Sequence, residues 1–198
     1  PPPPPPPFSM IRRPPRSTPR PSRRQRQMCI RDRTYDGIYY GHVFMQYDLV
    51  IQKVVLRLES ASSEQYISID TDKLTSFQID QTYFEYLTTD SSLNPGIYEI
   101  AYRGKKSSLV IHRTKSRVVK TTDKIRIFYR PYDFYYLQNQ FGTFQITNKK
   151  SFIDAYNSDP RIKQLIKTNK LSFSKSRLDT DIVQALIAIE DNASVNQR

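Results

Sequence analysis

Apolar and polar residues alternate along most of the chain between positions 35 and 146, which is the period of a β-strand with one buried face. The alternation comes in short segments separated by polar or turn-forming residues. The expected strands are residues 38–45, 54–59, 65–70, 75–80, 82–88, 97–103, 108–113 and 124–130, followed by a hairpin over 135–147 with its turn near 139–142. Short strands at such regular spacing predict an antiparallel sheet system, either a sandwich or a partial barrel.

After Asn148 the apolar period changes to that of a helix. Helices are expected over residues 149–156, 160–168 and 175–191, and the second begins with an aspartate before a proline, a favoured helix start. The side chains expected to be mostly buried are Phe152, Ile153, Ile162, Leu165, Ile166, Leu178, Ile182, Leu186 and Ile189. The sequence therefore predicts an α+β fold, with a β-rich domain over 34–147, a helical segment over 148–191 and a frayed tail over 192–198.

Residues 1–33 show neither period. They hold 11 of the 14 prolines, nine arginines and Cys29, the single cysteine of the chain. A segment of this composition cannot bury a core and is expected to be disordered and to pack on nothing. As a basic arm, it could bind a phosphate backbone through counterion release.

Two strings in this segment, "MIRRPPRST" and "QMCIRDR", resemble the translation of sequencing-adapter DNA left on assembled metagenomic reads. The resemblance covers residues 10–33, and the preceding "PPPPPPP" resembles a homopolymer read in frame. It implies that residues 1–33 are not native and that the true N-terminus, with any signal peptide, is missing. Foreign segments of this kind are left out of fold reasoning.

Leaving out residues 1–33 changes the charge of the chain. Lysine plus arginine fall from 31 to 22 and aspartate plus glutamate from 19 to 18, so the net charge falls from +12 to +4. The remaining charge is uneven, with about −7 over residues 34–102, +9 over 103–130 and +2 over 131–198. Whole-chain charge therefore gives no argument for nucleic acid, but the basic middle does stand out.

The basic middle is interleaved with aromatic residues, a combination that suits single-stranded nucleic acid because bases stack on rings. The candidate binding surface consists of Arg103, Arg113, Arg126, Tyr129, Arg130, Tyr132, Tyr135 and Tyr136. The alternative, which we favour from the sequence, is that these cations pair across the sheet with acidic strand residues such as Asp70, Asp80, Glu85 and Glu99.

Residues that could carry catalysis or bind metal are few. The two histidines, His42 and His112, lie in expected strands, and no G-x-S-x-G elbow or glycine-rich phosphate loop is present. The Asp-Thr-Asp strings at 70–72 and 179–181 lack the glycine and terminal glutamate of a calcium loop. We expect no catalytic residue, no metal or cofactor, no transmembrane segment, and helices that pack on the sheet rather than read DNA.

The opening "YGHVFM" strand and the ending from "YYLQNQFGTFQITNKKSFIDAY" onward resemble a group of uncharacterised exported proteins of Bacteroidota. That resemblance implies a periplasmic or cell-envelope location but no activity and no functional residue. The expected function is a non-enzymatic envelope protein that binds a partner or serves structurally. The alternative is a nucleic-acid-binding module that uses residues 103–136.

Overall fold

The computed structural model describes residues 28–60, 63–88, 93–121 and 125–195. These residues form two compact units. Unit 1 comprises the described residues up to Ile97 together with Thr114–Pro131, and unit 2 comprises Tyr98–Arg113 and the described residues from Tyr132 onward. The chain therefore crosses between the units more than once, and each unit is built from separated segments.

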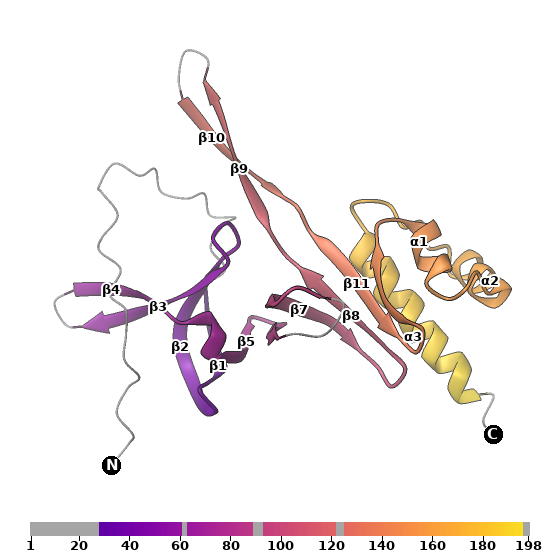
Figure 1. Ribbon diagram of the computed structural model, residues 1–198, viewed down its shortest axis with the longest axis horizontal. Coiled ribbons are helices and arrows are strands. Elements are labelled where there is room, and N and C mark those ends of the chain that lie inside the picture. The colour runs from indigo at the N-terminus through magenta and orange to yellow at the C-terminus, as the bar shows by residue number, and fades with distance from the viewer. Residues whose placement is uncertain (1–27, 61–62, 89–92, 122–124, 196–198) are drawn as a thin grey trace. The chain divides into compact units, whose positions relative to one another are not determined.

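Unit 1 is made of antiparallel strands (Figure 1). Its larger sheet has the strand order β6-β5-β1-β2-β3-β4. The bounds are β1 Met28–Tyr35, β2 Ile38–Asp48, β3 Lys53–Ser60, β4 Ser63–Ser68, β5 Leu74–Ile79 and β6 Thr82–Leu87, with a 3-10 turn at Thr71–Lys73. The remaining strands of this unit, β9 Lys115–Thr121 and β10 Ile125–Pro131, form a separate two-stranded sheet.

The expectation that residues 1–33 pack on nothing is wrong for Met28–Arg33. These residues belong to β1, in which Met28 to Arg31 pair with β2 and Arg33 pairs with both β2 and β5. The side chain of Arg33 is buried against the ring of Tyr40, 4.9 Å from its centroid. Main-chain hydrogen bonding needs no apolar period, so periodicity could not reveal this strand. The rest of the predicted arm, residues 1–27, lies outside the described residues.

The core of unit 1 is centred on three rings. Phe77 and Phe84 stack with centroids 4.8 Å apart, and Tyr47 meets both edge-on at 5.6 and 5.5 Å. Burial raises the pKa of the Tyr47 hydroxyl well above its ordinary range. Such edge-on and offset aromatic contacts add to the stability gained from burying the ring area itself.

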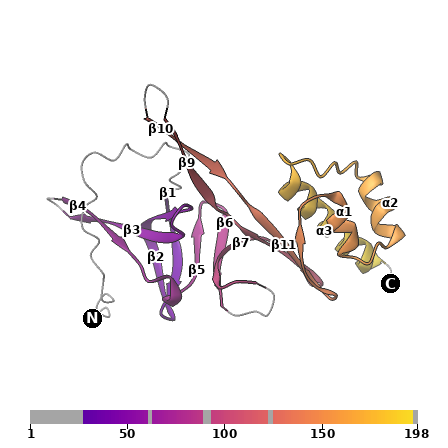
Figure 2. The ribbon, with the colours of Figure 1, turned by 45° about the horizontal axis from the view of Figure 1, so that its top comes forward.

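Unit 2 is a four-stranded antiparallel sheet with the order β12-β11-β8-β7 and three helices on one face (Figures 1 and 2). The strands are β7 Gly96–Arg103, which begins in unit 1, β8 Ser107–His112, β11 Phe134–Asn139 and β12 Gly142–Ile146. The helices are α1 Lys149–Asp154, α2 Pro160–Thr168 and α3 Leu178–Val195. One apolar core joins the sheet to the helices, from Leu109 and Leu137 to Phe152, Ile166 and Leu186.

The predicted helices and hairpin are confirmed, but the third helix begins at Leu178 instead of residue 175 and continues to Val195, so the predicted frayed tail is wrong over residues 192–195. Asp159 caps α2 by accepting a hydrogen bond from the Arg161 amide at 2.8 Å, and Pro160 takes the first helical position. Of the nine side chains expected to be buried, Ile153, Leu165 and Ile189 are partly buried and the others are buried in the core. The hairpin turn falls between the paired residues Asn139 and Gly142, as expected.

The α+β fold class, with antiparallel strands followed by C-terminal helices, is confirmed. The division into units differs from the boundary expected at residue 148, because the helices bury their apolar faces against β8, β11 and β12. Over the described residues, no helix combines the length and the apolar composition that crossing a membrane requires.

Candidate functional site

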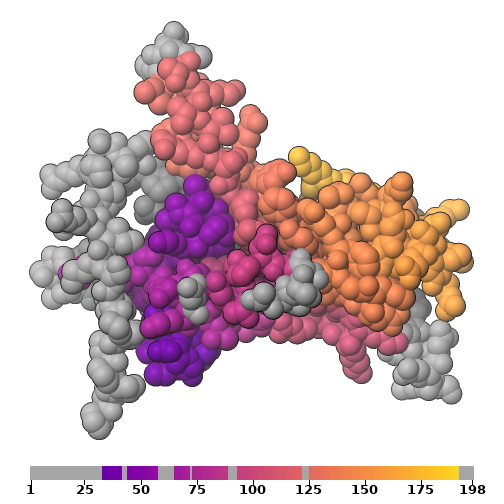
Figure 3. Space-filling view, viewed as in Figure 1, coloured from indigo at the N-terminus to yellow at the C-terminus, as the bar shows by residue number. Residues whose placement is uncertain are grey.

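The β9–β10 ribbon is a two-stranded sheet of its own and belongs to unit 1. Figures 1 and 2 show its two strands side by side, and Figure 3 shows its surface in salmon. Its register pairs Lys120 with Arg126, Val118 with Phe128 and Ser116 with Arg130. Residues directly opposite each other in an antiparallel pair lie on the same face, and sequence neighbours lie on opposite faces. The register therefore assigns every described residue of the ribbon to one of two faces.

One face, here called the cationic face, consists of Ser116, Val118, Lys120, Arg126, Phe128 and Arg130. Its three cations are exposed, and among the described residues none has an ion-pair partner. Phe128 lies between Arg126 and Arg130 along β10, and 43% of its surface is exposed. The Lys120 ammonium of β9 lies 5.8 Å from the centroid of its ring. This face offers three unpaired positive charges around an accessible ring.

The opposite face is more apolar. Its residues are Lys115, Arg117, Val119, Thr121, Ile125, Ile127, Tyr129 and Pro131. Val119 and Ile125 are exposed, the latter by 72%, whereas Tyr129 and Ile127 are half-buried. Tyr129, which the sequence grouped with Arg126 and Arg130, thus lies on the other face of the ribbon from both arginines.

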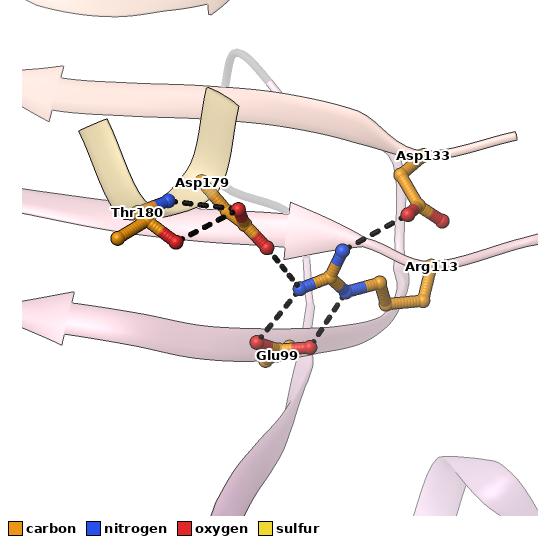
Figure 4. Close-up of polar contacts among 5 residues, drawn as sticks. All are labelled: Glu99, Arg113, Asp133, Asp179 and Thr180. Atoms are coloured by element: carbon orange, nitrogen blue, oxygen red, sulfur yellow. Dashed lines mark hydrogen bonds and ion pairs between the residues drawn. The ribbon is translucent and has the colours of Figure 1, made fainter. Parts of the chain in front are cut away.

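Arg113, also predicted for the binding surface, lies inside an ion-pair cluster of unit 2 (Figure 4). Its Nε and Nη2 donate to the two oxygens of Glu99 at 2.7 and 3.1 Å. Its Nη1 donates to Asp133 at 2.9 Å, and Nη2 lies 3.5 Å from Asp179 Oδ2. Burial alone would lower the pKa of Arg113, but the hydrogen bonds and charge of Glu99, and then of Asp133, raise it. This guanidinium is fully engaged within the protein.

The remaining predicted residues also belong to unit 2. Arg103 is exposed at the end of β7, and Tyr132 is 63% exposed with its ring edge-on to Phe134 at 4.9 Å. The ring of Tyr135 lies 6.0 Å from the Arg113 guanidinium, and the ring of Tyr136 lies 6.1 Å from that of Tyr98. The predicted surface is therefore divided between the two units, and only Arg126, Tyr129 and Arg130 share the ribbon.

The candidate surface predicted from the sequence omitted Phe128 and Lys120, although both lie within the basic stretch 103–136. The signal was available for Phe128, since strand alternation puts residues 126, 128 and 130 on one face and 129 on the other. The position of Lys120 could be assigned only from the register between β9 and β10. β9 was not predicted as a strand, and nothing in the sequence shows which of its residues lies opposite Arg126.

His112 lies within a cluster of aromatic rings. The ring of His112 lies between those of Tyr98 and Phe134, at 5.1 and 6.2 Å, and burial lowers its pKa while the charge of Asp133 opposes that shift. The side chain of His42 lies outside the described side chains. Across the described part of the chain, no group of three or more histidine, cysteine, aspartate or glutamate side chains is arranged to hold a metal ion.

No protein-family model, curated protein or solved structure matches the chain.

Proposed function

We propose that this chain is a non-enzymatic binding protein and that the cationic face of β9–β10 binds a single strand of nucleic acid. The observation that carries the proposal is the line of Arg126, Phe128 and Arg130 on one face of β10, an exposed ring between two unpaired cations. Aromatic rings on which bases stack, set among basic groups that follow the backbone, are the usual means of binding single strands.

The spacing of these residues supports the proposal. At a rise of roughly 3.3 Å per residue, Arg126 and Arg130 stand roughly 13 Å apart along the strand, with Phe128 midway. Two phosphates can then meet the arginines while the base between them stacks on the ring. Lys120 supplies a third contact on the neighbouring strand.

The electrostatics of the ribbon support the proposal as well. The described residues of β9 and β10 include five basic residues and no acidic residue. Lys120 lies directly opposite Arg126, and like charges at such positions destabilise a sheet. A bound phosphate removes that repulsion, so the ribbon gains stability when it binds an anion.

The test is binding of the full chain to a fluorescent oligothymidine, followed by anisotropy over a range of salt concentrations. We expect Arg126→Ala/Arg130→Ala to weaken binding and to reduce the slope of log K against log salt by about 0.7 for each phosphate that the variant no longer neutralises. The matched control is Lys163→Ala/Lys167→Ala, which removes two exposed charges from α2. Equal effects of the two double variants would mean that net charge, and not the ribbon, drives binding.

A second comparison tests the assignment of faces. Phe128→Ala should cost about 1–3 kcal/mol of binding free energy, the value of one stacked base. Tyr129→Ala, one residue away on the opposite face, should leave affinity nearly unchanged. A larger decrease in affinity from Tyr129→Ala than from Phe128→Ala would contradict the proposed face.

An envelope role is the second candidate function. The observation in its favour is the exposure of Ile125 and Val119 on the opposite face of the same cationic ribbon. Apolar side chains combined with lysine and arginine bind anionic lipid surfaces, which agrees with the envelope location that the resemblance implies. Under this candidate, Ile125→Ser weakens binding to phosphatidylglycerol vesicles and leaves oligothymidine binding intact.

A further inference from the structure

Unit 2 contains a half-open pocket of about 600 Å³ that belongs to none of the sites described above. It lies between the β7–β8 turn, the β11–β12 turn and the facing sides of α2 and α3. Its volume falls in the range of small-molecule sites. Both turns and both helices belong to the same compact unit, so the walls of the pocket are fixed relative to one another.

Some polar side chains of the pocket are hydrogen-bonded within the protein, and others are not. Asn139 donates to the Ala155 carbonyl at 2.9 Å and accepts from the Phe141 amide at 2.8 Å, and the hydroxyls of Ser107 and Tyr156 lie 3.1 Å apart. These bonds hold the floor and the β11–β12 turn. In contrast, Gln140, Gln164 and Thr168 line the pocket and make no side-chain hydrogen bond within the described residues. Two carboxamides and a hydroxyl therefore remain to bind a ligand, as both donors and acceptors.

An aromatic ring and two cations complete the lining. Phe141, at the tip of the β11–β12 turn, is 47% exposed, and the turn is held in place by the Asn139 side chain. Lys106 and Arg161 bring two positive charges to the lining, and Asp159, the cap of α2, brings one negative charge. Arg161 Nε lies 3.9 Å from Asp159 Oδ1, whereas the Lys106 ammonium has no carboxylate partner among the described residues. The charge that remains for a ligand is therefore the positive charge of Lys106.

We infer that this pocket binds a small anionic carbohydrate, such as a uronic acid or a sugar phosphate. Carboxamides match sugar hydroxyls because each supplies a donor and an acceptor. The exposed ring of Phe141 suits the apolar C–H face of a pyranose, and the Lys106 ammonium receives the carboxylate or phosphate. The pocket and the ribbon belong to different units, so this inference does not rest on nucleic-acid binding.

The test is an amide NMR titration of the ¹⁵N-labelled full chain with D-glucuronate, D-glucose 6-phosphate and neutral D-glucose. We expect one or both anionic sugars to shift the amide signals of Gln140, Phe141 and Gln164, and D-glucose to bind at least tenfold more weakly. A response to glucuronate alone would identify the acid group as a carboxylate, and a response to the phosphate alone would identify it as a phosphate. Equal binding of glucose, or shifts absent from these three residues, would overturn the inference.

Matched lysine variants separate a built site from general attraction. Lys106→Gln should abolish the preference for anionic over neutral sugar, whereas Lys163→Gln, also exposed but outside the lining, should preserve it. Phe141→Ala should reduce affinity for both classes of sugar. If Lys106→Gln and Lys163→Gln have the same effect, the anion is held by the general charge of the surface and the inference is wrong.

Discussion

The guanidinium of Arg113 lies among the carboxylates of Glu99, Asp133 and Asp179, which come from β7, the segment before β11 and the first turn of α3. Bidentate geometry toward Glu99 makes this the strongest kind of ion pair that arginine forms. The cluster ties the sheet of unit 2 to its longest helix. The alternative favoured from the sequence, in which cations pair with acidic strands, thus holds for Arg113 and Glu99 but not for Lys120, Arg126 and Arg130.

Removing the guanidinium would leave three carboxylates facing each other. We expect Arg113→Met to lower the free energy of unfolding by about 1–3 kcal/mol, because it leaves half-buried carboxylates without their hydrogen-bond donor. The measurement is urea unfolding, with Arg117→Met as the exposed control. A loss of stability no larger than that of the control would contradict the stabilising role of the cluster.

The lowered pKa of His112 predicts that the protein loses stability in weak acid. Burial lowers the pKa of its imidazole, so the folded state disfavours the charged form. Between the ordinary value near 6.5 and the lowered folded value, the unfolded chain binds more protons, and stability falls as the pH falls through this window. His112→Phe keeps an aromatic ring and cannot titrate. Relative to this variant, the wild-type chain should lose stability below about pH 6.5; parallel pH profiles would show that His112 makes no contribution.

Gly104 and Glu190 are coupled by their close approach. The Glu190 carboxylate accepts hydrogen bonds from the Lys105 and Lys106 amides, both at 3.1 Å. Burial alone would raise the pKa of Glu190, but these hydrogen bonds lower it. A Cβ on Gly104 would lie 2.0 Å from Glu190 Oε1, so the carboxylate would have to leave.

We therefore expect Gly104→Ala and Glu190→Ala each to cost about 1–3 kcal/mol of stability, the value of the two hydrogen bonds that each change removes. The double variant should cost no more than either single change, because both remove the same interaction. Additive effects in denaturant unfolding would contradict this coupling.

At the scale of elements, α3 is amphipathic in a way that its sequence already indicates. Leu178, Ile182 and Leu186 are buried in the core of unit 2, whereas Ile187 is 44% exposed. The buried carboxylate of Asp181 holds the preceding segment in place by accepting from the amides of Ser172 and Phe173 at 3.1 and 2.7 Å. The helix is thus attached by its apolar side and by the polar contacts of Asp179, Asp181 and Glu190.

Neighbouring residues of this helix should respond very differently to truncation. Leu186→Ala should cost roughly 2–5 kcal/mol, because the site is fully buried and a cavity remains. Ile187→Ala, next in sequence, should cost less than about 0.5 kcal/mol, as is usual for an exposed position. Both are measured by denaturant unfolding. A comparable destabilisation at the two positions would mean that α3 does not pack by the face described.

At the scale of the whole molecule, the described residues form two apolar cores with no residue in common. One lies within unit 1 and the other within unit 2. Cores of this kind open with their own free energies, which hydrogen exchange resolves.

A destabilising substitution in one core should therefore speed amide exchange mainly in the unit that contains that core. We expect Leu186→Ala to speed amide exchange in β8, β11 and the helices, and to leave the strands that carry Tyr47, Phe77 and Phe84 nearly as protected as before. Hydrogen exchange with mass spectrometry measures this. Uniform acceleration across both units would show that the chain unfolds as a single cooperative body.

The sequence alone determined most of the local elements, with the exception of β1 and β9, because those elements are set by a short-range period. Alternation identified β2, β5, β6, β7 and β8, and the 3.6-residue period with the Asp159-Pro160 start identified α2 and most of the buried side chains of α1 and α3. Only the tertiary structure decided which elements belong together, since pairing and burial join residues far apart in the chain. It placed Arg113 among three carboxylates, paired Lys120 with Arg126, and included Met28–Arg33 in β1 through main-chain bonds that no side-chain pattern encodes.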